Sequence, residues 1–100
     1  MSFAPVANLF DDTVVAFEPE AGGARFNVSA LNDPGTLLRV LEPFAKRGLT
    51  PDRVRSDRCD DDLTLVIEVD EMEAELAAYI GRCIQEIFVV RSVAVGGQTP

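Results

Sequence analysis

The sequence has no histidine and no tryptophan, and it has only two cysteines among its 100 residues. Without histidine there is no imidazole acid or base, no Ser-His or Cys-His nucleophile pair and no histidine-bearing zinc site. The cysteines, Cys59 and Cys83, are too few for a disulfide framework or a thiolate metal cage. Catalysis would depend on carboxylates, Lys46 or Tyr79, and no grouping of these side chains supports it. The sequence therefore predicts a protein that is not an enzyme and that uses no metal or cofactor.

Positive charge and long apolar segments are also scarce. Nine Lys and Arg residues stand against 17 Asp and Glu residues, which gives a net charge of −8. This balance excludes nucleic acid as an expected partner, because binding to a phosphate backbone requires a surface rich in Lys and Arg. No apolar run approaches the length of a bilayer span, and the N-terminus carries Asp11 and Asp12 where a signal peptide would be basic. We therefore expect no membrane association and a cytoplasmic location.

The length suits one domain, and the composition divides the chain into three parts. Residues 1–23 are rich in turn-forming residues and read as an N-terminal arm with one short strand, while residues 96–100 read as a flexible tail. Between them, residues 24–95 show regular periodicity. Apolar residues alternate over 26–31 and 63–69, and less clearly over 50–59 and 88–95, which predicts strands. Stripes with helical spacing predict helices over 34–46 and from Asp70 to about residue 87, with Gly48 ending the first and Pro43 kinking it.

The resulting order is β-α-β-β-α-β, which predicts a ferredoxin-like α+β sandwich. Its four-stranded antiparallel sheet would carry both helices on one face, with the first and third strands central and the second and fourth at the edges. The other face would expose an apolar set comprising Val66 and either Val89 or Val90, beside Val14, Val15 and Phe17 of the arm. Such a face would require cover, so we expect a homodimer, a higher oligomer or another protein partner.

The turn that joins the first long strand to the first helix is the most informative segment. Asp33 is a suitable N-cap, Pro34 suits the first helical position, and Gly35 leaves room for a ligand or a second backbone. The free N–H groups of a helix N-terminus suit a carboxylate, which predicts an anion site against residues 35–37. The alternative is that the segment is only an efficient turn and helix cap.

The chain also resembles the ACT domain family, most closely the short single-ACT regulatory (small) subunits of acetolactate synthase. The resemblance covers about residues 25–95. It depends on the strand at 26–30, the motif Asn32-x-Pro34-Gly35-x-Leu37-x-Arg39-Val40, and the helix end Phe44-x-x-Arg47-Gly48-Leu49. In effector-binding members this loop and the start of the next strand hold an amino acid across a dimer interface. The resemblance therefore implies a ligand site made of Asn32, Asp33, Gly35, Thr36, Leu37, Leu49 and Thr50, with Leu49 and Thr50 supplied by the adjoining subunit.

Two functions are consistent with these features. One is a dimeric, non-catalytic regulatory module that senses an amino acid, with branched-chain amino acids the first candidates, or that regulates a biosynthetic enzyme such as acetolactate synthase through its catalytic subunit. The other is a structural interaction domain of the same fold without a small-molecule ligand. Most of the positive charge falls within residues 39–58, where it forms either a docking patch for an acidic partner or an edge whose charges pair with one another.

Overall fold

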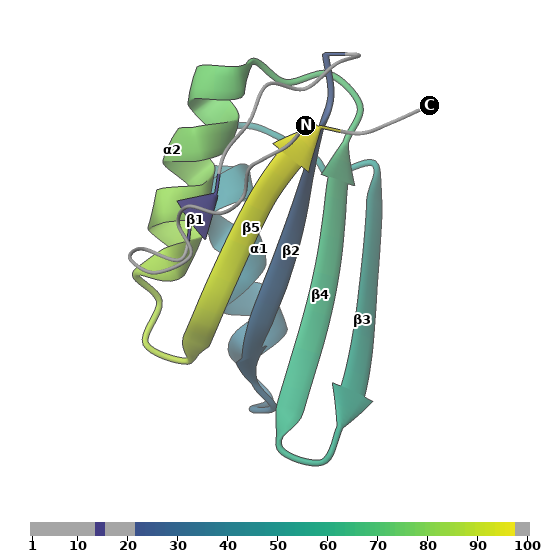
Figure 1. Cartoon of the computed structure of the whole chain (residues 1–100), viewed down its shortest axis with the longest axis vertical. Coiled ribbons are helices and arrows are strands. Elements are labelled where there is room, and N and C mark those ends of the chain that lie inside the picture. The colour runs from purple at the N-terminus through teal and green to yellow at the C-terminus, as the bar shows by residue number, and fades with distance from the viewer. Residues whose placement is uncertain (1–13, 16–21, 98–100) are drawn as a thin grey trace.

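The strands form one mixed sheet, and four of them follow one another across it in the order that the sequence predicts. The computed structural model describes residues 14–15 and 22–97. The elements are β1 (Val14–Val15), β2 (Ala24–Leu31), α1 (Thr36–Lys46), β3 (Arg53–Cys59), β4 (Asp62–Val69), α2 (Ala74–Gln85) and β5 (Val90–Gly97). The sheet order is β1-β5-β2-β4-β3 (Figure 1), and β2 through β5 pair antiparallel. The predicted ferredoxin-like βαββαβ fold is confirmed, with β2 and β4 central and β3 at one edge.

The other edge differs from the prediction. β1 pairs parallel with β5, with Val14 opposite Val93, so β5 is an interior strand and its predicted edge position is wrong. β1 lies within the predicted arm, whose residues 1–13 and 16–21 are outside the described part of the chain. The last strand extends through Gly96 and Gly97, which the sequence predicts to be part of the tail, while residues 98–100 are outside the described part of the chain.

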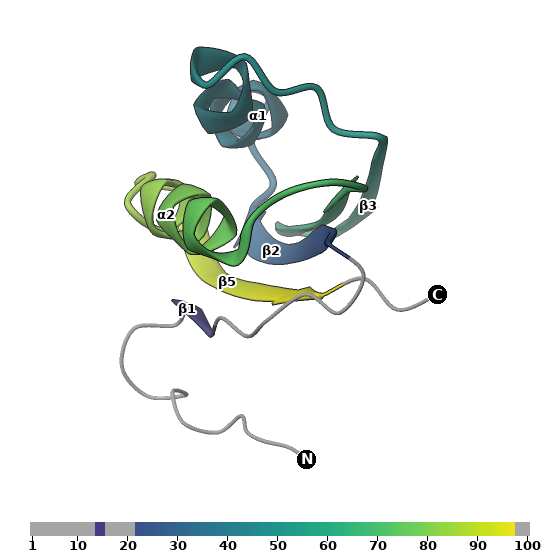
Figure 2. The same cartoon turned by 90° about the horizontal axis from the view of Figure 1, so that it is seen from above.

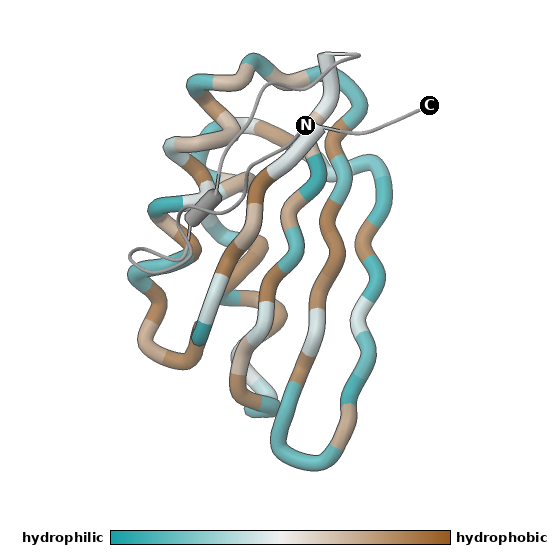
Figure 3. The backbone as a smooth tube through the Cα atoms, viewed as in Figure 1, coloured by the Kyte–Doolittle hydropathy of each residue, from teal (hydrophilic) through white to brown (hydrophobic). Residues whose placement is uncertain are grey.

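Both helices lie on the same face of the sheet (Figure 2) and bury the apolar sides of the strands. Phe26 of β2 and Phe44 of α1 are 0% exposed and meet edge to face, with ring centroids 5.1 Å apart and planes at 85°. Ile80 and Ile84 of α2 complete the buried layer. Figure 3 shows apolar residues recurring along β2, β4 and β5, whereas β3 is mainly hydrophilic, and all seven of its residues are exposed.

The C-terminal end of α1 lies where the sequence predicts it, whereas the N-terminal end of α2 does not. Gly48 ends α1 in the left-handed region (φ +72), as predicted, and α1 continues through Pro43 as one helix. The predicted cap of α2 is wrong, because this helix begins at Ala74 with Glu73 as its N-cap. The carboxylate of Asp70 instead accepts a hydrogen bond from Arg53. In the described part of the chain, neither helix has the length and hydropathy to cross a bilayer.

The predicted apolar outer face includes Phe17, which lies outside the described residues, and the part of it on β4 and β5 differs from the prediction. Val89 and Val90 are buried, and of that predicted set only Val66 is described on the outer side, where it is half-buried. The reason is a register shift between β2 and β5 at Ser29 and Ala30, which pairs Ser29 with Ser92 and Ala30 with Val90. A bulge of this kind turns Val90 toward the same side as Val93. Among the described residues, the neighbours of Val66 on the outer side are therefore mostly polar or charged, and the predicted oligomer stays a prediction.

Charge on the outer side of β3 and β4 is paired within the chain. The Glu68 carboxylate accepts hydrogen bonds from Arg53 Nε at 2.6 Å and from Arg25 Nε at 3.0 Å. Arg53 also pairs with Asp70, and Arg55 Nε lies 3.2 Å from Asp57. The hydrogen bond from Arg53, followed by that from Arg25, lowers the pKa of Glu68, and the same contact with Glu68 raises the pKa of the Arg53 guanidinium. Within the 39–58 segment, the positive charges of Arg53 and Arg55 on β3 are therefore paired with carboxylates of the chain itself and do not form a docking patch.

Lowering the pH should remove the contribution of Glu68 to stability. A carboxylate whose pKa is lower in the folded state stabilises the fold above its unfolded pKa of about 4.3, and this contribution is lost as the pH falls through the folded value. Glu68→Gln should therefore lower Tm at pH 7, and this difference should shrink as the pH falls below about 4.3. Thermal unfolding of both proteins across this range is the measurement, with Asp57→Asn as the control for an open ion pair. A Tm difference that does not vary with pH would contradict this assignment.

Candidate functional site

The turn before α1 is held to the opposite hairpin by Asn32. Its backbone N–H donates to the carbonyl of Asp61 at 2.9 Å, and its side-chain Nδ2 donates to the carbonyl of Asp60 at 3.1 Å. Asp60 has a positive φ of 55°, which is typical of a tight hairpin turn. Asn32 therefore fixes the distance between the loop that starts α1 and the turn that joins β3 to β4.

The N-terminus of α1 already binds an anion, which is the carboxylate of Asp33. The N–H of Gly35 donates to Asp33 Oδ2 at 3.0 Å, and the N–H of Thr36 donates to the Asp33 carbonyl at 3.0 Å. Gly35 is the N-cap and α1 begins at Thr36, so the predicted roles of Asp33 as N-cap and Pro34 as first helical residue are shifted by two residues. The predicted ligand cradle at residues 35–37 stays a prediction, and in this structure Asp33 accepts the hydrogen bonds of the Gly35 and Thr36 N–H groups.

Thr36 and Gly35 contact other parts of the loop and helix rather than the pocket. The Thr36 side chain is 0% exposed, and its Oγ1 donates to the carbonyl of Leu31 at 2.9 Å. A Cβ added to Gly35 would lie 3.6 Å from Asp33 Oδ2 and 3.8 Å from Arg39 Nε, which are ordinary contact distances. Neither residue lines the adjacent pocket. The idea that Gly35 keeps space open for a ligand is therefore not supported by its position.

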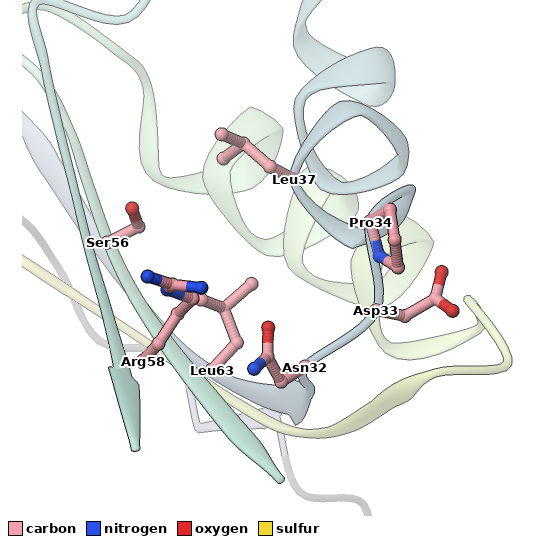
Figure 4. A pocket seen from close by; sticks show the side chains of 7 residues that line it. All are labelled: Asn32, Asp33, Pro34, Leu37, Ser56, Arg58 and Leu63. Atoms are coloured by element: carbon pink, nitrogen blue, oxygen red, sulfur yellow. The ribbon is translucent and has the colours of Figure 1, made fainter. Parts of the chain in front are cut away.

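A pocket of about 550 Å³ opens between this turn and the inner side of the β3–β4 hairpin. Figure 4 shows its two walls facing each other, with the loop and α1 on one side and the hairpin on the other. The pocket is lined by Asn32, Asp33, Pro34, Leu37, Ser56, Arg58 and Leu63. Three of the predicted ligand residues, Asn32, Asp33 and Leu37, are thus brought together.

The hairpin wall is the part that sequence reasoning missed. Ser56 pairs with Leu65 and Arg58 pairs with Leu63, and both leucines are buried on the helix side. Since paired residues of an antiparallel ladder share a face, Ser56 and Arg58 also point to the helix side. Period two along β3 could have separated Arg58 from Arg53 and Arg55, which lie on the outer side. The distance to Asn32, however, depends on how the sheet is assembled.

Leu49 and Thr50 lie at the other end of α1. The helix has 11 residues and is therefore about 16 Å long, and both residues follow its C-terminus. Leu49 packs against the core and donates its N–H to the carbonyl of Phe44, while Thr50 is exposed. Within one chain they do not line the pocket. Their assignment to an adjoining subunit stays a prediction.

The pocket combines three kinds of chemistry. Arg58 supplies a guanidinium that can bind a carboxylate through two parallel hydrogen bonds. Asn32 supplies a side-chain amide oxygen on the opposite wall, where the Asp33 carboxylate turns away from Arg58 toward the N–H of Gly35 (Figure 4), and Leu37, Leu63 and Pro34 supply apolar surface. No group of three or more metal-binding side chains occurs among residues 14–15 and 22–97. The thiol of Cys59 is exposed and that of Cys83 is half-buried, and neither forms a disulfide.

Comparison with known proteins points to ACT domains, both in sequence and in structure. A family model described as an ACT-like domain matches residues 19–99. The ACT domain from GTP pyrophosphokinase of Chlorobium tepidum aligns with a TM-score of 0.64 and 10% sequence identity, covering 73% of this chain and 95% of that one. GqqA, described as a novel type of quorum-quenching acylase, aligns with a TM-score of 0.57 and 16% identity, covering 90% of this chain but 49% of GqqA. No curated protein sequence matches.

Proposed function

Because the chain belongs to the ACT-like domain family, we propose that it is a non-catalytic regulatory module that senses a small amino acid in the pocket between Asn32 and Arg58. ACT domains are in general regulatory ligand-binding modules. The observation that carries the proposal is the arrangement of Arg58, Asn32 and an apolar wall around one pocket. The resemblance to the small subunits of acetolactate synthase suggests the wider role, which is control of an enzyme of amino-acid biosynthesis.

An α-amino acid matches this pocket group by group. Its carboxylate would pair with the Arg58 guanidinium, and its ammonium group would lie toward the side-chain oxygen of Asn32, whose amide nitrogen donates to Asp60 (Figure 4). Its side chain would pack against Leu37 and Leu63, which favours the branched-chain amino acids. The pocket volume of about 550 Å³ lies within the range of about 300 to 1,000 Å³ that is typical of small-molecule sites.

Such a ligand would also link two parts of the fold. Asn32 belongs to the loop before α1, whereas Arg58 belongs to β3. Hydrogen bonds from Asn32 to residues 60 and 61 already join the loop to the β3–β4 hairpin. A bound amino acid would add a second link and restrain β3 relative to α1. Among the described residues no strand pairs with the edge of β3 that faces away from β4. This edge is therefore available to a second copy of the chain or to the regulated enzyme. The ligand would thereby change the affinity for that partner.

Arg58→Ala should weaken the binding of valine, leucine or isoleucine by roughly tenfold to a hundredfold. The reason is that a hydrogen bond to a charged group contributes about 1.5 to 3 kcal/mol. Calorimetric titration of the three amino acids measures the effect. Arg55→Ala is the matched control, because Arg55 lies on the same strand but faces the other side of the sheet.

The alternative is an interaction domain of the same fold that binds no small molecule. It is favoured by one observation, which is that Asp33 already fills the anion position at the start of α1. Absence of heat and of any thermal shift with all three amino acids would refute the sensing proposal and leave this alternative. Equal affinities of wild type and Arg58→Ala would instead refute the assigned site.

A further inference from the structure

A second groove lies between α1 and α2, on the helical layer of the molecule. It has a volume of about 250 Å³ and is lined by Arg39, Glu42, Pro43, Lys46, Arg47, Tyr79, Cys83 and Ile87. The two helices lie side by side in Figure 2, and the groove shares no lining residue with the pocket near Arg58. Neither the fold nor the proposed amino-acid site accounts for its composition.

The groove concentrates positive charge on an otherwise acidic chain. Within the described residues, the ion pairs of Arg25, Arg53, Arg55 and Arg91 are made on the sheet or, with Asp70, directly after β4. Arg39, Lys46 and Arg47, in contrast, are exposed and have no carboxylate within 4.0 Å among residues 14–15 and 22–97. One carboxylate, that of Glu42, lies with these three cations in the groove. The local charge is therefore opposite to the net charge of −8.

The base of the groove is apolar, and one cation is oriented by an aromatic ring. Pro43, Cys83 and Ile87 are half-buried, and the Tyr79 side chain is 40% exposed. The Arg47 guanidinium carbon lies 4.6 Å from the centre of the Tyr79 ring, within the range of a cation–π contact. The contact with Tyr79 thus holds the charge of Arg47 beside the groove, and the N–H groups of its guanidinium stay accessible to a partner.

The distance between the cations of the groove suits a third helix laid along it. Arg39 and Lys46 are seven residues apart on α1, which places them on one side of the helix about 10.5 Å from each other. On α2, Tyr79 and Cys83 are four residues apart and share one side of the helix, and Ile87, just after the end of α2, lines the same groove. A third helix laid along this groove would meet apolar surface in the middle and a cation at each end.

We propose that the α1–α2 groove is a docking site for an acidic amphipathic helix of a partner protein. The helix would carry two carboxylates about two turns apart, paired with Arg39 and Lys46, and apolar residues between them packed on Tyr79 and Ile87. A protein segment fits better than a nucleic acid or an anionic membrane, because three cations beside Glu42 on a chain of charge −8 make too small a positive surface for a polyanion.

The test uses two labelled model peptides of about 18 residues, long enough to form a helix on binding. The acidic peptide has Glu at two positions seven apart with Leu at the third and fourth positions after the first Glu, and the basic peptide has Lys in place of both Glu residues. Fluorescence anisotropy should give saturable binding of the acidic peptide to wild type, at least about tenfold tighter than binding of the basic one. Arg39→Glu/Lys46→Glu should reverse this preference, and Arg39→Gln/Lys46→Gln should weaken acidic-peptide binding without reversing it.

The control Arg55→Glu/Arg91→Glu makes the same change of net charge on the sheet and should leave both affinities unchanged. Circular dichroism verifies that each variant is folded. The proposal is overturned if the control variant loses as much affinity as the groove variant, if wild type does not distinguish the peptides, or if neither peptide saturates up to about 1 mM. Amino-acid titration of the groove variants is independent of these outcomes, because the pocket near Arg58 shares none of the substituted residues.

Discussion

Phe44→Ala should lower the free energy of unfolding by about 3 to 5 kcal/mol, which is the usual cost of deleting a fully buried phenyl ring. Phe44 is 0% exposed, and its ring meets that of Phe26 at 5.1 Å, so the substitution leaves a cavity between α1 and the sheet. Helix α1 also carries Leu37, which forms part of the pocket wall. Loss of Phe44 should therefore weaken the amino-acid site as well. Urea unfolding followed by circular dichroism measures the change in stability.

Leu38→Ala provides the control for this effect. Leu38 is on the same helix but is 73% exposed, so its replacement should change the unfolding free energy by no more than about 0.5 kcal/mol. A loss below about 1 kcal/mol for Phe44→Ala would mean that α1 is not packed against β2 as described.

Thr36→Val should lower the free energy of unfolding by about 1 to 3 kcal/mol. The Thr36 hydroxyl is buried and donates to the carbonyl of Leu31 at 2.9 Å, and valine of nearly the same shape leaves that carbonyl without its donor. The family resemblance assigns Thr36 to the ligand, whereas its position gives it the task of holding the loop to the end of β2. The two roles predict different results for the two measurements that follow.

Thr36→Ser keeps the hydroxyl and separates these roles. If Thr36 is structural, the serine variant should retain most of the stability that valine loses, and calorimetry under conditions where both variants are folded should show amino-acid affinities close to that of wild type. A valine variant of normal stability that no longer binds the amino acid would instead show that Thr36 contacts the ligand directly.

The sequence by itself determined the order of the elements and most of the core. Alternation over 26–31 and 63–69 identified the two central strands, and the helical stripe around Val40 and Phe44 identified α1, because burial of one face is recorded in the local period of the chain. Gly48 ended α1 as expected, since its left-handed conformation is a local property. Residues 32–34 of the turn before α1 line one wall of a pocket, and the ligand site predicted at this turn stays a prediction.

What only the tertiary structure decided were the choices between competing partners. Asp33 and Asp70 both fit a helix cap by composition, but Asp33 turned its side chain to the N–H of Gly35 and Asp70 paired with Arg53 from a distant strand. The bulge opposite Ser29 buried Val90, and pairing with β4 turned Arg58 toward Asn32. Sequence periodicity reports which side chains are buried, because burial repeats along each element. The register between strands and the competition for a hydrogen-bond partner depend on residues far apart in the chain, and these set the second wall of the pocket.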